Sequence, residues 1–184
     1  MNQALTTSRE DHIIIWLAAL AITIHIAEAA LPTPLPGVKP GLANVVTLIA
    51  VYFFGWRIAI WVSLLRILVG SLIIGSFLSP TFFLSLSGAI CSLLMLRLAL
   101  WWSQSVPMLR FSTIGYSIIA AMAHMYGQFW VAYWLFIHHD GIFTILPILM
   151  TVSVVFGIVS GIVAKEVIQR LESRLNPDLS ISKQ

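Results

Sequence analysis

The side chains of this sequence that are best suited to bind a ligand are ionisable and amide groups set inside long apolar stretches. His25 and Glu28 are three residues apart, and His124 and Gln128 are four residues apart. Both spacings place the two side chains on one face of a helix. Arg66 stands in the middle of another apolar stretch. Because a buried charge is costly unless it is paired, Arg66 and Glu28 are expected to face each other, water or a ligand.

Small and neutral polar residues accompany these groups. Asn44 begins one apolar stretch, and Gly70 follows the arginine by one helical turn, where it lets a neighbouring helix approach. Ser85, Gly88 and Ser92 form one stripe on a further helix. The serines have a structural alternative, since a serine in a membrane helix often bonds the backbone of its own helix.

The composition predicts an integral membrane protein. Of the 184 residues, 59% are hydrophobic and 9% are charged, whereas about 25% are charged in a soluble domain. A spanning helix needs about 20 mostly apolar residues. Six segments approach that length, at residues 13–31, 42–56, 58–77, 81–102, 113–137 and 142–164. The expected fold class is therefore an all-α bundle of six transmembrane helices.

The distribution of Lys and Arg predicts how this bundle is oriented. If the connections alternate between the two sides, one side carries Arg9, Arg57, Arg97, Arg110, Lys165, Arg170, Arg174 and Lys183. The positive-inside rule then places both termini in the cytoplasm, and the expected location is a bacterial inner membrane. The chain divides into a cytoplasmic segment 1–12, a membrane domain 13–165 and a cytoplasmic tail 166–184.

In this orientation the polar groups lie between the middle of the membrane and its outer surface. A charge at mid-membrane costs about 2.5–3.5 kcal/mol on insertion scales, so the groups are expected to surround a cavity that opens outward. Two alternatives stay open. Arg66 and Glu28 can form a purely structural buried pair, and His124 can join two helices without contacting a ligand.

The segment LPGVKPGLAN, residues 35–44, precedes a second helix of only about fifteen residues. Such a helix is about 22 Å long, against an apolar bilayer core of about 30 Å. The segment is therefore expected to dip into the membrane and to line the cavity. Its Lys39 and Asn44, with the N-terminus of the second helix, form a natural site for an anion. The alternative is that Lys39 extends to lipid headgroups.

The first apolar segment also imitates a secretory signal, because Arg9 precedes it and residues 27–29 read Ala-Glu-Ala. Glu10 and Asp11 disrupt the positively charged start that a signal needs. We therefore expect the first helix to remain in the protein.

Near the other end of the chain, Gly157 and Gly161 form a GxxxG pattern, which Ser153 extends backward. This pattern predicts close packing between membrane helices and nothing more specific.

Several motifs of this chain together resemble the membrane family called the Gx transporter family, which also carries the name heptaprenyl diphosphate synthase component I. They are PGVKPGLANVVTL at 36–48, Arg66 with Gly70, SLSGAICSLLM at 85–95, STIGYS at 112–117, AHMYGQ at 123–128 and the region 147–161. The resemblance covers about residues 13–165.

This resemblance implies a fold similar to that of the S components of energy-coupling-factor transporters, which capture a solute from outside the cell. It implies a small-molecule solute as ligand, and a transmembrane coupling subunit and ATPases as partners. The residues that it assigns to the substrate pocket are Glu28, Lys39, Asn44, Arg66, Ser85, His124 and Gln128. Two features depart from the family pattern: Pro40 replaces an apolar residue, and the first helix lacks a clean pair of alanines for docking a coupling subunit.

The synthase name does not predict catalysis by this chain. Prenyl diphosphate synthases hold Mg²⁺ through clusters of aspartates, and a hard cation needs several oxygen ligands. After the first dozen residues the sequence has only Asp140 and Asp178, far apart, and no DDxxD motif. The adjacent His138, His139 and Asp140 are interpreted as a polar outer loop, because adjacent side chains diverge on a helix.

We therefore expect a protein without enzymatic activity, cofactor, metal or nucleic-acid partner. The alternative function is a non-catalytic membrane subunit of a quinone-linked, isoprenoid-linked or electron-transfer assembly.

Overall fold

The computed structural model describes residues 9–30, 43–105 and 111–175, and those residues form helices and short connections without any strand. The helices are α1 (Arg9–Ala30), α2 (Ala43–Phe54), α3 (Trp56–Ile74), α4 (Pro80–Ser105), α5 (Thr113–Val131) and α6 (Leu146–Leu175). A π-helical turn η2 (Ala132–Ile137) continues α5, and a 3-10 turn η3 (Asp140–Thr144) precedes α6. The predicted all-α class is confirmed.

Four of these helices, α1, α3, α4 and α6, are long and apolar enough to cross a membrane. The helix α2 has 12 residues, which makes it about 18 Å long and shorter than the apolar core of a bilayer. The helix α5 is not one of these four. Its sequence is mostly apolar, but the polar His124 and Gln128 lower its mean hydropathy. The six predicted segments thus correspond to six helices, and the number that cross the membrane completely stays a prediction.

Glycines with positive φ set two of the boundaries. Gly55 (φ 84°) separates α2 from α3 by itself, so the turn is shorter than the expected connection at 55–57. Gly75 (φ 76°) ends α3 in the left-handed conformation, and its N–H donates to the carbonyl of Leu72. This helix therefore ends three residues before position 77, where the apolar segment ends.

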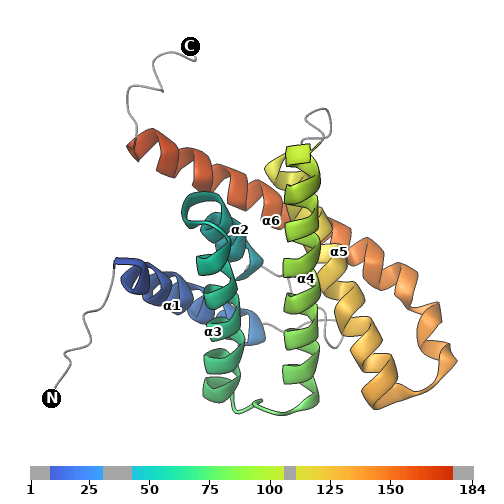
Figure 1. The fold of residues 1–184 in the computed structure, drawn as a ribbon. Coiled ribbons are helices and arrows are strands. Elements are labelled where there is room, and N and C mark those ends of the chain that lie inside the picture. Colours follow the sequence, from blue (N-terminus) through green and yellow to red (C-terminus); the bar gives the residue numbers. More distant parts are fainter. Residues whose placement is uncertain (1–8, 31–42, 106–110, 176–184) are drawn as a thin grey trace, which may run out of the picture.

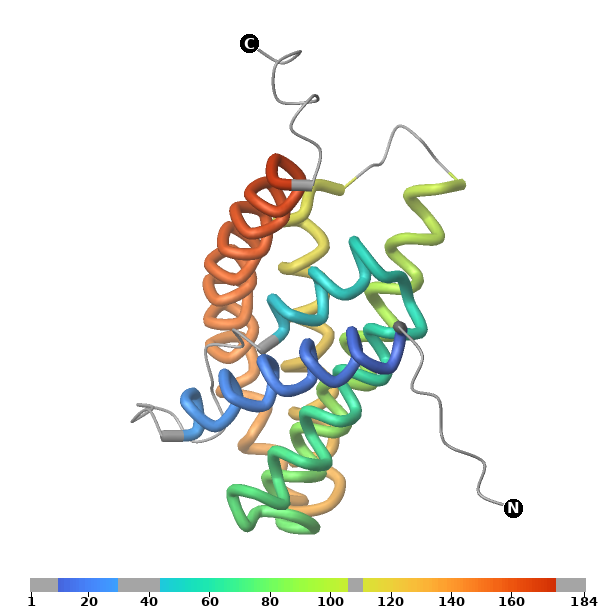
Figure 2. The backbone as a smooth tube through the Cα atoms, turned by 90° about the vertical axis from the view of Figure 1, so that its left-hand side faces the viewer, coloured from blue at the N-terminus to red at the C-terminus, as the bar shows by residue number. Residues whose placement is uncertain are grey.

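The helices form two groups of three. In one group α1 and α2 both pack on α3, and in the other α5 packs extensively on α4 and on α6, whereas α3 and α4 share fewer contacts. Figure 1 shows α3 and α4 upright beside each other, with α1 crossing α3 at a steep angle. The turned view in Figure 2 shows α1 and α2 (blue and cyan) running obliquely to the other helices.

The short helix α2 connects the two groups through its buried side chains. Val46 and Ala50 pack with α1 and α3 residues such as Val62. Val45, Leu48 and Ile49 pack instead with residues of α4 and α6. Because residues 45–50 are all buried, α2 is enclosed by protein along its middle.

Small residues bring α5 and α6 into close contact. A Cβ added at Gly157 would lie 2.9 Å from Cα of Ile118, and one added at Gly161 would lie 2.7 Å from Cα of Ile114. The glycines therefore let the two backbones approach closely, and the predicted packing role of the GxxxG pattern is confirmed.

Polar contacts connect helix ends that the charge distribution assigns to one side of the membrane. Nη1 of Arg57, at the start of α3, lies 3.7 Å from Oε2 of Glu10 in α1. The hydroxyl of Tyr52, near the end of α2, donates to Oε1 of Glu172 near the end of α6 at 2.6 Å. The start of α3 thus lies beside the start of α1, and the end of α2 lies beside the end of α6. The cytoplasmic location of these helix ends stays a prediction.

Candidate functional site

A polar cavity of about 70 Å³ lies at the boundary between the two groups of helices. All six helices contribute to its wall, and the lining residues are His25, Glu28, Asn44, Arg66, Ile67, Ser85, Ser117, Ala121, His124, Met125, Gln128, Ser153, Phe156 and Ser160. A single water needs about 10–15 Å³ of accessible cavity, so this space accommodates several waters or one small solute.

The charged side of the cavity is formed by Arg66 of α3 with Glu28 of α1. Their exposed fractions are only 5% and 4%, and the carboxylate of Glu28 attracts the guanidinium electrostatically. Nη1 of Arg66 donates a long hydrogen bond of 3.4 Å to Oδ1 of Asn44. Its Nε is buried and has no hydrogen-bond partner among the described residues. One N–H donor of the arginine is therefore still unsatisfied.

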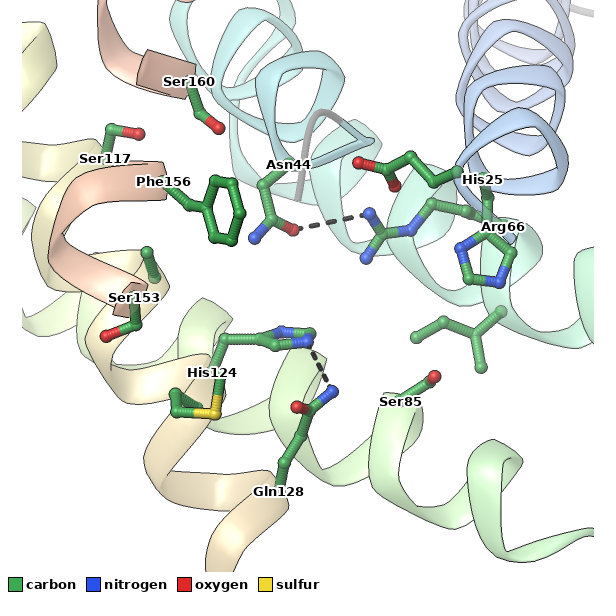
Figure 3. A pocket seen from close by; sticks show the side chains of 14 residues that line it. His25, Asn44, Arg66, Ser85, Ser117, His124, Gln128, Ser153, Phe156 and Ser160 are labelled. Atoms are coloured by element: carbon green, nitrogen blue, oxygen red, sulfur yellow. Dashed lines mark hydrogen bonds between the residues drawn. The ribbon is translucent and has the colours of Figure 1, made fainter. Parts of the chain in front are cut away.

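The neutral side of the cavity is formed by His124 and Gln128 of α5. Their Nε2 atoms are 3.0 Å apart, and the glutamine amide donates to the imidazole in the tautomer whose proton is on Nδ1. That Nδ1 is also buried and lacks a partner within the described part of the chain. Figure 3 shows Arg66 and Asn44 on one side of the cavity, His124 and Gln128 opposite them, and the ring of Phe156 at one wall.

Gly88 of α4 allows this pair to take its position. A Cβ added there would lie 2.8 Å from Nε2 and Cε1 of His124 and 2.9 Å from Cγ of Gln128. The imidazole therefore rests on the backbone of α4, which fixes the direction of its ring.

We expect Gly88→Ala to displace the imidazole and to lower the free energy of unfolding by about 1–3 kcal/mol, the usual range for overpacking. The matched control is Gly115→Ala in α5, where the nearest atom is a Cβ of Phe111 at 3.2 Å. Thermal unfolding of both variants in detergent measures the difference. Equal stability of the two variants would show that the contact at Gly88 is not restrictive.

Six of the seven residues that the family resemblance assigns to the substrate pocket surround this cavity: Glu28, Asn44, Arg66, Ser85, His124 and Gln128. The seventh, Lys39, lies outside the described residues, as do Pro40 and most of the segment 35–44. Ser87 donates to the carbonyl of Leu84 in its own helix at 3.0 Å, which is the structural alternative for the serines. Substrate binding by these residues stays a prediction.

His25, which the sequence analysis singled out with Glu28, also lines the cavity. Sequence reasoning missed another part of the wall, namely Phe156 and three buried serines. Ser117 lies on the same face of α5 as His124 and Gln128, at a spacing of seven and eleven residues. Extending that stripe by helical periodicity would have found it. Ser153 and Ser160 of α6 are each 3% exposed, and the sequence suggested only a packing role for this stretch.

The arrangement is suited to binding and has no feature of a metal centre. Among the described residues no group of three His, Cys, Asp or Glu side chains could hold a metal ion. His139 accepts a hydrogen bond from the Gly141 N–H at 2.9 Å, and Asp140 accepts one from Tyr133 at 2.9 Å. Both are exposed, in agreement with the interpretation of a polar loop.

Comparison with known proteins assigns the chain to a family. The model of the family described as heptaprenyl diphosphate synthase component I matches residues 17–167. The chain belongs to this family. No curated protein and no solved structure gives a significant match.

Membership in the component I family agrees with the resemblance found in the motifs. The family is a non-catalytic component of the synthase, so the prediction that this chain is not itself an enzyme is confirmed. The family name and the apolar helices together identify a multi-pass membrane protein.

Proposed function

We propose that this component I family member is a membrane solute-binding subunit, which takes up a small polar or anionic solute from the extracytoplasmic side. The observation that carries this proposal is the pair of buried nitrogen atoms without partners, Nε of Arg66 and Nδ1 of His124, at one cavity. A buried donor without a partner costs about 1–3 kcal/mol, so this arrangement is stable when a ligand or water supplies the acceptor.

The chemistry of the cavity wall restricts the class of solute. Both unsatisfied groups are donors in the tautomer described above, and they favour a carboxylate, a phosphate-like group or a carbonyl oxygen. The volume of about 70 Å³ is well below the roughly 300–1,000 Å³ of pockets for drug-sized ligands. The solute is therefore small, or it binds with movement of the wall.

The source of energy for uptake is a separate part of the proposal. A transmembrane coupling subunit and ATPases are the expected partners, because the motifs resemble the Gx transporter family, and this resemblance implies a fold similar to that of S components. The exposed apolar side chains of α1, including Trp16 and Leu20 at 75% and 50%, leave a surface for lipid or for such a subunit.

The family description favours a second candidate, a non-catalytic membrane subunit of a quinone-linked or isoprenoid-linked assembly. In that case the Arg66 and Glu28 pair would stabilise the fold, and water would occupy the cavity.

Native mass spectrometry of the gently purified full-length chain tests the proposal. We expect a small bound molecule on the wild-type protein, and at least about tenfold lower occupancy in His124→Leu, which corresponds to about 1.4 kcal/mol. His138→Leu is the matched control, since His138 is exposed and is not part of the cavity wall. Copurified redox or prenyl-transferring subunits without any bound small molecule would support the second candidate instead.

A further inference from the structure

A second cavity of about 200 Å³ lies beside the first one, between α1, α3 and α4. Its lining residues are His25, Ala29, Ile67, Ser71, Ile74, Ser76, Thr81, Phe82 and Ser85. Four of them, from Ile74 to Phe82, surround the turn between α3 and α4. The predicted orientation places this turn at the outer surface of the membrane.

The two cavities share part of their walls. His25, Ile67 and Ser85 line both of them. Figure 3 shows His25 and Ser85 on the side of the first cavity that is opposite Phe156. A solute that moved from the second cavity to the first would therefore pass between these three side chains.

The position of His25 in this shared wall depends on Gly70 of α3. A Cβ added at Gly70 would lie 3.0 Å from Cδ2 of His25, so the imidazole packs directly on the helix backbone. This close contact explains why a glycine follows Arg66 by one turn. The imidazole thus lies in the wall that separates the two cavities.

The lining of the second cavity is suited to passage of a polar solute more than to tight binding. Hydroxyl groups come from Ser71, Ser76, Thr81 and Ser85, and His25 is the one ionisable residue among the described residues of the wall. Ser71 already donates to the carbonyl of Leu68 at 2.9 Å. Hydroxyls can replace the water around a solute, but the described part of this wall carries no fixed charge comparable to Arg66 that would retain the solute.

The second cavity can exist because α3 packs only sparsely on α4. These helices are joined by a short turn, yet they share far fewer contacts than α4 shares with α5. Gly75 (φ 76°) and Leu78 (φ 59°) both have left-handed backbone in this turn. Ser76 of this turn lines the second cavity, so the turn forms one end of its wall.

We propose that the second cavity is the access vestibule of the binding cavity, with His25 as the side chain that controls passage between them. The vestibule takes the same class of small polar or anionic solute and holds it weakly. This inference rests on the proposed function for the identity of the solute, and its test requires no solute.

The test measures how fast iodoacetate, a small anion, alkylates single cysteines in the full-length chain in membrane vesicles. In a Cys91→Ser background, Ser71→Cys reports on the vestibule and Ser153→Cys reports on the binding cavity alone. We expect Ser71→Cys to react faster than Ser153→Cys. Adding Thr81→Trp, at an exposed position of the vestibule wall, should slow both reactions by at least about tenfold, because thiol reactivity depends on access.

Two further variants make the test specific. Thr151→Trp replaces an exposed threonine that lines neither cavity, so it should leave both rates unchanged. His25→Ala should accelerate Ser153→Cys by at least about threefold and leave Ser71→Cys unchanged, since it widens the passage between the cavities.

The inference is overturned if Ser71→Cys does not react, if Thr81→Trp slows Ser71→Cys alone, or if His25→Ala leaves Ser153→Cys unchanged. These outcomes are independent of the proposed function. A protein that shows the expected labelling pattern and binds no solute would contradict the proposed function alone.

Discussion

Replacing Arg66 by alanine is expected to lower the free energy of unfolding by about 3–5 kcal/mol and to abolish solute binding. Arg66 and Glu28 are only 5% and 4% exposed, and the guanidinium attracts the carboxylate. Removing the arginine takes an attracting positive charge away from that buried carboxylate, and it also removes the N–H donor at Nε.

Stability in detergent, followed by thermal unfolding, and occupancy in native mass spectrometry measure the two effects separately. The matched control is Arg57→Ala, because Arg57 has an 82% exposed side chain and a surface ion pair with Glu10 at 3.7 Å. Exposed ion pairs contribute about 0–1 kcal/mol, so this variant should keep both its stability and its bound solute.

The double variant Arg66→Ala/Glu28→Gln distinguishes a binding site from a purely structural ion pair. Without the carboxylate the buried charge is gone, and we expect the double variant to regain at least about 2 kcal/mol of the stability lost by Arg66→Ala. Binding should not return, because the donor is still missing. A double variant that is stable and retains the solute would show that the pair has a structural role only.

Hydropathy predicted where the chain is apolar, and this is not the same as where it is helical. The first helix starts at Arg9 and not at residue 13, because Glu10 and Asp11 add no hydrophobicity but are favourable in the first turn of a helix. The last helix continues to Leu175, well past the end of the apolar segment at residue 164. There Arg170 Nε donates to Glu166 Oε1 at 2.7 Å, one turn apart, which supports a solvated helix.

The candidate site could be predicted where the sequence carries a costly group. Arg66, Glu28 and His124 are expensive in an apolar environment, so their mutual proximity followed from the energy of burial. The serines of α6 gave no such signal, because a serine satisfies itself on its own helix. Ser153 donates to the Met150 carbonyl at 2.7 Å. The packing of α6 on α5 and on α2 determines which face of α6 the cavity meets.

That packing leads to the second large expected effect, at Gly161. A Cβ at this position would lie 2.7 Å from Cα of Ile114 and 3.0 Å from Cβ of Ser117. Cα of Ile114 is a backbone atom and cannot move by rotation of a side chain. The two helices would have to separate or shift along each other.

We expect Gly161→Ala to lower the free energy of unfolding by about 1–3 kcal/mol. The larger side chain of Gly161→Leu should lower the free energy of unfolding further. The measurement is thermal unfolding in detergent, with Gly115→Ala as control. Gly115 is in α5 and would meet only side-chain atoms of Phe111, and replacing a helical glycine gains up to about 1 kcal/mol in helix propensity. The two alanine variants should therefore change stability in opposite directions.

The same substitution should weaken binding as well, because Ser160 precedes Gly161 and Ser117 faces it across the contact. Both serines line the cavity and are 3% exposed, so separation of α5 from α6 changes the distance between two of its walls. Native mass spectrometry of Gly161→Ala should show reduced occupancy, and Gly115→Ala should retain the solute. If Gly161→Ala were as stable and as fully occupied as the wild type, the close approach of α5 and α6 would not determine the shape of the site.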